Sequence, residues 1–313
     1  MSRRLVVLGY HNIDPTAAFG GTSAEAARRT FAGQVRLLRR WTNVVPLRAA
    51  LTDLAEGRPL PPRAVALTFD DGYLDNATVA APVLHAAGLS ATFFLVPEFL
   101  SGRTQAWWEE LGWAVAHATA TEVRWAGRSF DLSSPTARSA SLGVLSDLLK
   151  EIPGDQRGDA VVELRERALR GTRPPAPGRQ FMDWDEANRL VGLGHDIGSH
   201  TRSHPIMSRE DSATQAGQLV GSRHDLEDHF QRPVDVLAYP NGRVKDYSAE
   251  TLRLTREAGY AFAVTTRTAV AGPATAPHEV PRVLVDAETD LREAIRKGIR
   301  VVERALPGRG RRS

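Results

Sequence analysis

The sequence contains no cysteine. This absence excludes disulfide bonds and thiolate ligands, so any metal ion bound by this chain must be held by histidine and carboxylate side chains. The sequence also lacks an apolar run long enough to span a bilayer. The first apolar run, which begins at Leu5, is too short for a signal peptide and ends at Tyr10-His11. We therefore expect a cytoplasmic protein without a transmembrane segment.

A strong excess of charge of one sign is absent as well. The 40 Lys and Arg residues nearly balance the 37 Asp and Glu residues, and the net charge is +3. Because no basic cluster is interleaved with aromatic residues, nucleic-acid binding is not expected. The composition, 42% hydrophobic and 25% charged, is typical of a globular protein. A chain of 313 residues can form one α/β barrel or two smaller domains, and the composition leaves the oligomeric state open.

The sequence does contain a pair of adjacent carboxylates, Asp70 and Asp71, between the apolar run Val65–Leu67 and Gly72. Adjacent side chains on a regular strand point to opposite faces. Because Gly72 ends the regular strand, both carboxylates can reach one site. A metal hydrolase needs one carboxylate on the metal and a second one that accepts a proton from water. A solvated turn is the alternative interpretation of this motif taken alone.

A histidine pair, His200 and His204, follows another apolar run that ends in small residues. Pro205 disfavours the helical conformation at His204, so we predict a strand end followed by a tight turn. Two imidazoles and one carboxylate are a usual ligand set for catalytic zinc, with one position left open for water. Two such motifs at two strand ends favour a metal site over a surface histidine pair.

Apolar runs alternate with helical patterns along most of the chain, which predicts parallel strands with helices outside. The helical patterns include Ala77–Ala87 and a long stretch from about Met207 to Phe230, and capping patterns at Thr22–Glu25 and Asp183–Glu186 predict two further helix starts. About seven strands can be counted, fewer than the eight of a standard barrel. In such folds the functional site lies at the C-terminal ends of the strands. Each polar candidate follows an apolar run in this way: His11, Asp70, Asp71, His200, His204 and the Tyr239–Gly242 turn.

The pattern changes between residues 101 and 180, where four of the six tryptophans and two polar helical stretches occur. We interpret this segment as a largely helical insertion into a single domain that spans residues 1–313. The tryptophans could stack on sugar rings, but anchoring of the insertion to the barrel is the simpler role for their area. Residues 305–313 form a basic C-terminal tail.

Two motifs carry a family resemblance. Thr68–Gly72 and His200–His204 resemble the first two motifs of the polysaccharide deacetylases of the NodB-homology type, carbohydrate esterase family 4. Tyr73–Asn76, Ala91–Phe94 and Ile197–His200 are similar to the scaffold of that family. The resemblance implies an irregular (β/α)7 barrel and a metal-dependent hydrolase that removes an N-acyl group, such as N-acetyl, from an amino-sugar polysaccharide, oligosaccharide or glycoconjugate. The cofactor expected is one divalent ion, with zinc as the first choice and cobalt, nickel or manganese as alternatives.

The predicted roles follow from amide hydrolysis. Asp71, His200 and His204 hold the cation, and Asp70 accepts the proton of the attacking water. The turn from Tyr239 to Gly242 resembles the third motif of the family, in which a backbone N–H stabilises the oxyanion. Pro240 has no N–H, so Asn241 is the better donor candidate.

The chain departs from the family pattern in two places. The arginine that opens the third motif in many relatives and a late Leu-x-His that supplies the general acid are both missing where expected. Tyr10-His11 instead resembles the early Tyr-His pair of the subgroup that acts on poly-N-acetylglucosamine, which implies His11 as the general acid. His278 is the alternative acid, although it precedes the last predicted strand and is expected nearer the opposite end of the barrel. Two other functions stay open: an amidohydrolase of a small C–N substrate, such as a cyclic ureide or an acylated amine, and a catalytically silent carbohydrate-binding homologue.

Overall fold

The computed structural model describes residues 2–13, 24–176, 178–286 and 289–294. Its main sheet is formed by short, mostly buried strands that run parallel. They are β1 (Leu5–Tyr10), β2 (Asn43–Val44), β3 (Ala64–Phe69), β4 (Thr92–Leu95), β7 (Asp196–Ser199), β8 (Val236–Ala238), β9 (Phe262–Val264) and β10 (Val283–Leu284).

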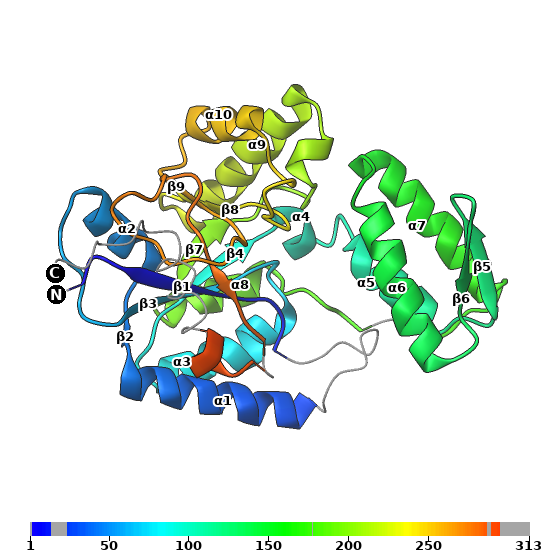
Figure 1. The fold of residues 1–313 in the computed structure, drawn as a ribbon, viewed down its shortest axis with the longest axis horizontal. Helices are drawn as coiled ribbons and strands as arrows, with labels where there is room; N and C mark the ends of the chain where they lie inside the picture. Colours follow the sequence, from blue (N-terminus) through cyan, green and yellow to red (C-terminus); the bar gives the residue numbers. More distant parts are fainter. Residues whose placement is uncertain (1, 14–23, 177, 287–288, 295–313) are drawn as a thin grey trace, which may run out of the picture.

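The strand order is β10-β1-β3-β4-β7-β8-β9, and the short β2 pairs with β3 beside this path. Val264 of β9 also forms a parallel bridge with Val280, just before β10, which draws the two ends of the order together. The sheet is therefore curled into an irregular (β/α) barrel, as predicted (Figure 1). The seven predicted strands correspond to the seven on the path, and β2 was not predicted.

Helices cover the outside of the curled sheet. They are α1 (Ala24–Trp41), α2 (Leu47–Ala55), the π-helical turn η1 (Asn76–Ala80) that continues into α3 (Ala81–Ala86), α4 (Pro97–Leu100), α8 (Trp184–Gly192), the 3₁₀ turn η2 (Met207–Arg209), α9 (Ser212–Phe230) and α10 (Ala249–Glu257). Helix α8 begins with the predicted capping box, in which Asp183 and Glu186 each accept the other's backbone N–H.

Two helix predictions need correction. The segment expected as one long helix from Met207 to Phe230 is η2 followed by α9, because the Asp211 side chain caps a new helix by accepting the Thr214 N–H. The helix expected from Ala77 to Ala87 starts as a π-helical turn. The Thr22–Glu25 capping pattern lies partly, and the basic tail 305–313 wholly, outside the described residues.

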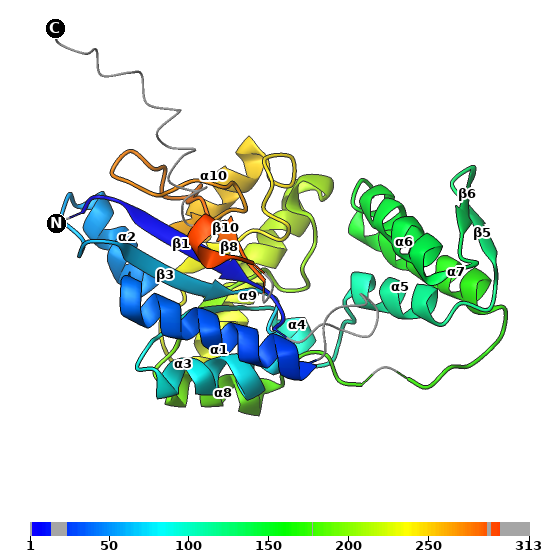
Figure 2. The same cartoon turned by 60° about the horizontal axis from the view of Figure 1, so that its bottom comes forward.

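The insertion forms a separate lobe beside the barrel, seen on the right in Figures 1 and 2. It contains α5 (Trp107–Ala116), the antiparallel hairpin β5 (Glu122–Trp125) and β6 (Arg128–Asp131), α6 (Pro135–Leu149) and α7 (Gly154–Leu169). The two predicted helical stretches correspond to α6 and α7, whereas the hairpin was not predicted. Leu111, Phe130, Leu145 and Val161 are among the buried residues of a core confined to this lobe.

In the described part of the chain, we find no helix whose length and hydrophobicity would suit a bilayer.

Candidate metal centre and active site

The Asp-Asp-Gly turn begins where β3 ends. The Asp70 N–H still donates to the Tyr10 carbonyl at 2.9 Å, so Asp70 keeps the register of the sheet. Asp71 then takes φ of 72° and Gly72 φ of 75°, both in the left-handed region. A non-glycine residue is uncommon there and is held by its surroundings. This turn brings both carboxylates to the same lip of the barrel, each with its own partners.

Asp71 faces the two histidines. Its Oδ1 atom lies 3.3 Å from Nε2 of His200 and 3.3 Å from Nε2 of His204. All three residues are buried. His200 follows β7, and its Nδ1 lies 2.7 Å from the Ala238 carbonyl, so Nδ1 is the protonated nitrogen and Nε2 is free to bind a metal.

These residues fit a divalent cation. One ligand atom from each lies within 4.8 Å of the other two. Among the described residues, Oδ1 of Asp71 is a buried oxygen without a hydrogen-bond partner, although two nitrogens face it. An unpaired buried carboxylate oxygen is costly, and a cation between these atoms would satisfy it. Burial opposes ionisation of Asp71, but the two neighbouring imidazoles hold its pKa well below the ordinary value, which keeps it an anionic ligand.

Asp70 has a different partner, Arg282. The guanidinium donates two parallel hydrogen bonds of 2.7 Å to the Asp70 carboxylate, and both side chains are almost completely buried. Burial alone would raise the pKa of Asp70, but the charge of Arg282 and the nearby His200 lower it. Asp70 is therefore anionic at neutral pH and is held in one orientation.

Sequence reasoning missed Arg282. The arginine that opens the third motif in many relatives is missing from this sequence at the expected place, and Arg282 supplies a guanidinium from just before β10. Its Nε also donates to the Thr265 carbonyl at 3.0 Å. The available signal was a single charged residue within the apolar run Val280–Val285.

The structure separates the two candidate acids. Nε2 of His11 lies 3.9 Å from Oδ2 of Asp70, and 42% of the His11 side chain is exposed. His11 is therefore beside the carboxylates and open to a substrate. His278 lies before β10, where its Nε2 is 2.8 Å from the carbonyl of Tyr260, which precedes β9. His278 thus sits at the opposite end of these strands from the carboxylates.

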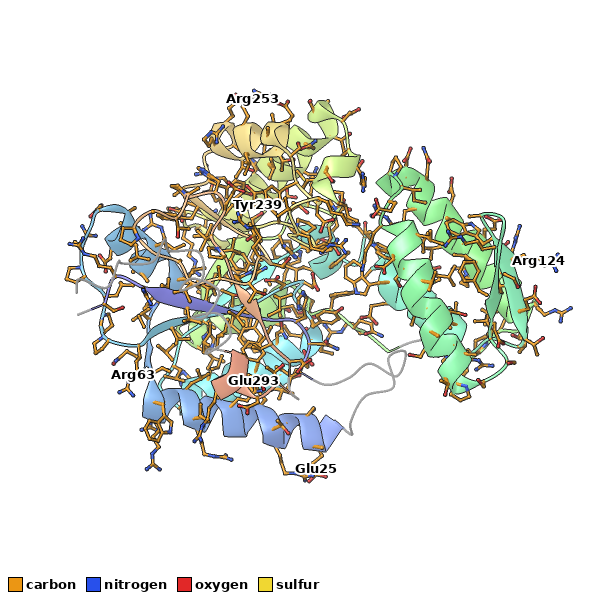
Figure 3. The ribbon with its side chains drawn as sticks, viewed as in Figure 1. Glu25, Arg63, Arg124, Tyr239, Arg253 and Glu293 are labelled. Atoms are coloured by element: carbon orange, nitrogen blue, oxygen red, sulfur yellow. The ribbon has the colours of Figure 1, made fainter. Side chains whose placement is uncertain are left out.

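The predicted oxyanion turn contributes one usable group. Tyr239 is fully buried, its hydroxyl donates to Thr255, and its N–H donates to the Val264 carbonyl, so Tyr239 has no group to offer a substrate (Figure 3). Asn241 has φ of 57°, and within the described residues no acceptor takes its N–H. The prediction for Tyr239 is therefore corrected, and Asn241 stays the donor candidate.

Aromatic residues form the wall between this site and the insertion. The Trp108 ring of α5 lies 4.6 Å from the His204 ring, and Phe99 lies 6.2 Å from it. Tyr73, two residues after Asp71, accepts the Trp108 Nε1–H and donates to Glu109, each at 2.8 Å. Sequence analysis did not place any of the tryptophans at the site.

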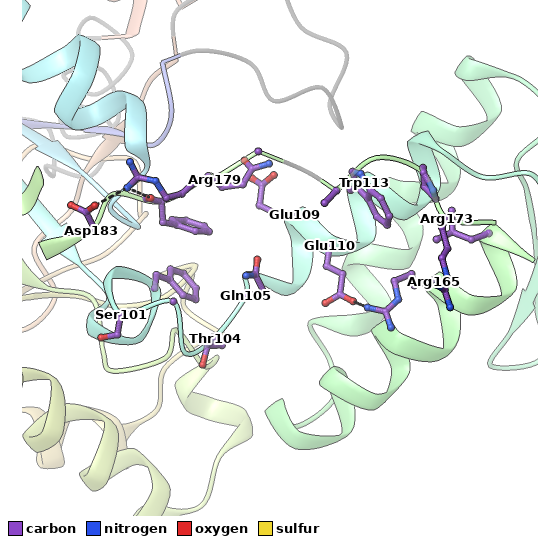
Figure 4. A pocket seen from close by; sticks show the side chains of 18 of the residues that line it. Ser101, Thr104, Gln105, Glu109, Glu110, Trp113, Arg165, Arg173, Arg179 and Asp183 are labelled. Carbon is purple, nitrogen blue, oxygen red and sulfur yellow. Dashed lines mark hydrogen bonds and ion pairs between the residues drawn. The ribbon is translucent and has the colours of Figure 1, made fainter. Parts of the chain in front are cut away.

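A cleft of about 1360 Å³ lies beyond this wall, between the barrel and the insertion (Figure 4). Phe99 and Phe181 line it from the barrel side, and Glu109, Trp113 and Arg165 from the insertion. The five residues Asp70, Asp71, His200, His204 and Arg282 are not among its lining, so this cleft is a neighbour of the carboxylate–histidine site and not its mouth.

The fold and site together are a curled (β/α) barrel that carries, at one lip, a buried carboxylate–histidine group able to hold a metal ion and a second carboxylate paired with an arginine. The sequence profile of the polysaccharide deacetylase family matches residues 57–135 and 157–263, more than half of the chain. This protein belongs to that family. It is therefore a deacetylase-type hydrolase of carbon–nitrogen bonds other than peptide bonds.

Individual relatives are distant. YxkH of Bacillus subtilis (strain 168), itself named as a polysaccharide deacetylase only provisionally, is 22% identical over 90% of this chain and 71% of its own length. The deacetylase PplD of Streptococcus pyogenes superposes with a TM-score of 0.63 at 15% identity, covering 95% of this chain and 99% of PplD. IcaB of Ammonifex degensii superposes with a TM-score of 0.61 at 21% identity, covering 95% of this chain and 98% of IcaB. At these identities the structural matches support the fold alone.

Proposed function

We propose that this protein is a metal-dependent N-deacetylase of an amino-sugar polysaccharide, oligosaccharide or glycoconjugate. The observation that carries the proposal is that two groups of residues lie side by side at one lip of the barrel. Asp71, His200 and His204 converge with an unpartnered carboxylate oxygen, and Asp70 is clamped beside them by Arg282. A silent carbohydrate-binding homologue would need neither arrangement.

A divalent ion, with zinc first and cobalt, nickel or manganese as alternatives, would be held by Asp71, His200 and His204. When bound, it would polarise the acyl carbonyl and make water more acidic. One ligand atom from each of the three buried residues lies within 4.8 Å of the other two, and two imidazoles with one carboxylate are a donor set that catalytic zinc uses.

Asp70 accepts a proton as water adds to the acyl carbon. Because Arg282 holds the carboxylate by two hydrogen bonds, its position is fixed before the substrate arrives. The N–H of Asn241 donates to the oxygen that becomes negative in this step. When the C–N bond breaks, the leaving amine needs a proton, and the exposed imidazole of His11 supplies it. The products are the carboxylic acid and the free amine.

The similarity of the Tyr10-His11 pair to the poly-N-acetylglucosamine subgroup favours an N-acetylglucosamine polymer as substrate. Mass spectrometry of the zinc-loaded protein with a panel of N-acetylated oligosaccharides and small amides tests this. We expect a loss of about 42 Da per acetyl group removed from an amino sugar. Hydrolysis of small amides alone would support the second enzyme function instead, and hydrolysis of neither would exclude the proposal.

A further inference from the structure

The two ligand histidines are oriented by different means. The Nδ1 of His200 is fixed by the Ala238 carbonyl at 2.7 Å. The Nδ1 of His204 is buried and has no hydrogen-bond partner within the described residues. Metal-binding imidazoles almost always donate their second N–H to a carboxylate, a carbonyl or water, which fixes the ring. His204 therefore needs another constraint to present Nε2 to a cation.

An aromatic side chain from the insertion supplies that constraint. The centroids of the Trp108 and His204 rings are 4.6 Å apart, with 58° between the ring planes. The rings of Phe99 and His200 also pack against the His204 ring, at centroid distances of 6.2 and 4.8 Å. His204 also has φ of 62° in a turn before Pro205, so its backbone is held in an uncommon conformation. The ring of His204 is enclosed by aromatic surface where a hydrogen bond would ordinarily hold it.

Trp108 is itself firmly placed. Its Nε1–H donates to the Tyr73 hydroxyl, which in turn donates to the buried Glu109. The Trp107 ring packs edge-on against the Trp108 ring, with 5.7 Å between the ring centroids. Tyr73 follows the Asp70-Asp71-Gly72 turn directly, so this chain of contacts joins α5 to both sides of the metal centre. The insertion is therefore attached to the barrel beside His204, so its position affects a predicted metal ligand.

We propose that Trp108 is a positioning residue of the metal centre, which orients His204 by packing. The inference rests on the proposed function only in that a cation binds at Asp71, His200 and His204. A freely rotating imidazole loses conformational entropy when it binds a metal ion. Because the Trp108 ring already restricts His204 in the metal-free protein, less entropy is lost when the ion binds. The metal-free protein needs no such orientation, so metal affinity is the property that Trp108 controls.

Four proteins test the inference: the natural sequence, Trp108→Ala, Trp108→Phe and the control Trp113→Ala. Trp113 lies on the same helix but packs on His117 at 5.3 Å and donates to the Pro175 carbonyl. Zinc affinity is measured on the stripped proteins by competition with a chelator, without substrate. Circular dichroism and the melting temperature of the metal-free proteins report the fold.

We expect Trp108→Ala to weaken zinc binding about 10–100-fold, the usual effect of losing support for a ligand histidine. Trp108→Phe, which keeps an aromatic ring, is expected to restore most of the affinity, and Trp113→Ala to leave it unchanged. Should Trp108→Ala fail to fold, Trp108→Leu replaces it, with the same expected loss.

Natural affinity in the folded Trp108→Ala or Trp108→Leu protein would overturn this inference and leave the proposed function intact. Equal weakening by Trp113→Ala would overturn it as well, since the effect would then be a general loss of the insertion. Absence of zinc binding by the natural protein would overturn both proposals.

Discussion

The barrel and the insertion are built on separate cores and differ in what they give to the site. The barrel core stacks Tyr10, Phe69 and Phe93 at 5.1 and 4.8 Å directly beneath the strand ends that carry the carboxylates. The insertion core, around Leu145 and Val161, shares no residue with it among the described residues. The polar groups of the site come from the barrel, and the insertion contributes the Trp108 ring that packs on His204.

This difference shows that the two regions have separable roles. A small cluster of Tyr73, Phe99 and Phe181, with Trp108 packed against it, joins them beside His204. A second contact between the insertion and the barrel is formed by Glu151, after α6, which pairs with Arg209 of η2 and with Lys245 before α10. Substitutions at the barrel residues of the site should therefore abolish most activity. Substitutions in the cluster should have smaller effects on the site, and substitutions at the second contact should have little effect.

The largest effect is expected from Asp70→Asn. The amide cannot accept a proton, so turnover should fall about 10²–10⁴-fold while zinc affinity stays near its natural value. Steady-state kinetics and chelator competition measure the two quantities separately. Loss of zinc in Asp70→Asn together with its retention in Asp71→Asn would mean that the roles of the two carboxylates are reversed.

Arg282→Met leaves the Asp70 carboxylate buried without its partner. Breaking a buried ion pair typically costs about 3–5 kcal/mol in the free energy of unfolding, which urea denaturation measures. The pKa of Asp70 is lowered by Arg282 and should rise in this variant, so the acid limb of the pH–rate profile should move to higher pH.

The matched control is Arg48→Met. Arg48 also pairs with a single carboxylate, with its Nε within 2.8 Å of both oxygens of Asp235, but 60% of its side chain is exposed, so about 0–1 kcal/mol is expected. Adding Asp70→Asn to Arg282→Met should restore part of the lost stability. Equal costs for Arg282→Met and Arg48→Met would show that Arg282 is not an essential partner of Asp70.

His11→Ala removes the proposed acid. We expect turnover to fall about 10²-fold or more and the alkaline limb of the pH–rate profile to disappear, with zinc affinity unchanged. His278→Ala, at the other end of the strands, is the control and should keep the limb. The opposite pattern would make His11 a structural residue and remove the comparison with the early Tyr-His subgroup.

Glu109→Gln examines the junction between the two regions. Burial first, and then the negative charge of Asp71, raises the pKa of Glu109 to about 7, although the Tyr73 hydrogen bond opposes this. The folded protein therefore prefers protonated Glu109, so the natural protein should lose stability as the pH rises from about 4.5 to 7. The loss is at most about 3 kcal/mol.

Glu109→Gln resembles the neutral acid and should lack this slope. Urea denaturation of the metal-free proteins at several pH values measures it. Parallel stability curves for the two proteins would show that Glu109 is already ionised in the folded state.

The smallest effect is expected from Glu151→Gln. Its pairs with Arg209 and Lys245 are largely exposed, and such pairs contribute about 0–1 kcal/mol. A change above 2 kcal/mol in the unfolding free energy would show that the second contact is also needed to hold the insertion.

The sequence by itself determined the strands, the order of the motifs and the pairing of Asp-Asp-Gly with His-x-x-x-His. These depend on local properties: apolar runs, a glycine or proline that ends them, and a capping residue such as Asp183. Because parallel strands end at one edge, residues at several strand ends were predicted to meet. The same logic predicted that His278, before the last strand, would lie at the other end.

Tertiary structure decided what no local pattern carries. Arg282 reaches Asp70 from 212 positions along the chain, because β10 pairs with β1 and β1 pairs with β3. Tyr239 is buried in a cluster with Leu219 of α9 and Leu254 of α10, and Trp108 meets His204 because the insertion packs beside the barrel at this point. Such contacts depend on how separate elements pack, and a long-range approach leaves no periodic signal in the sequence.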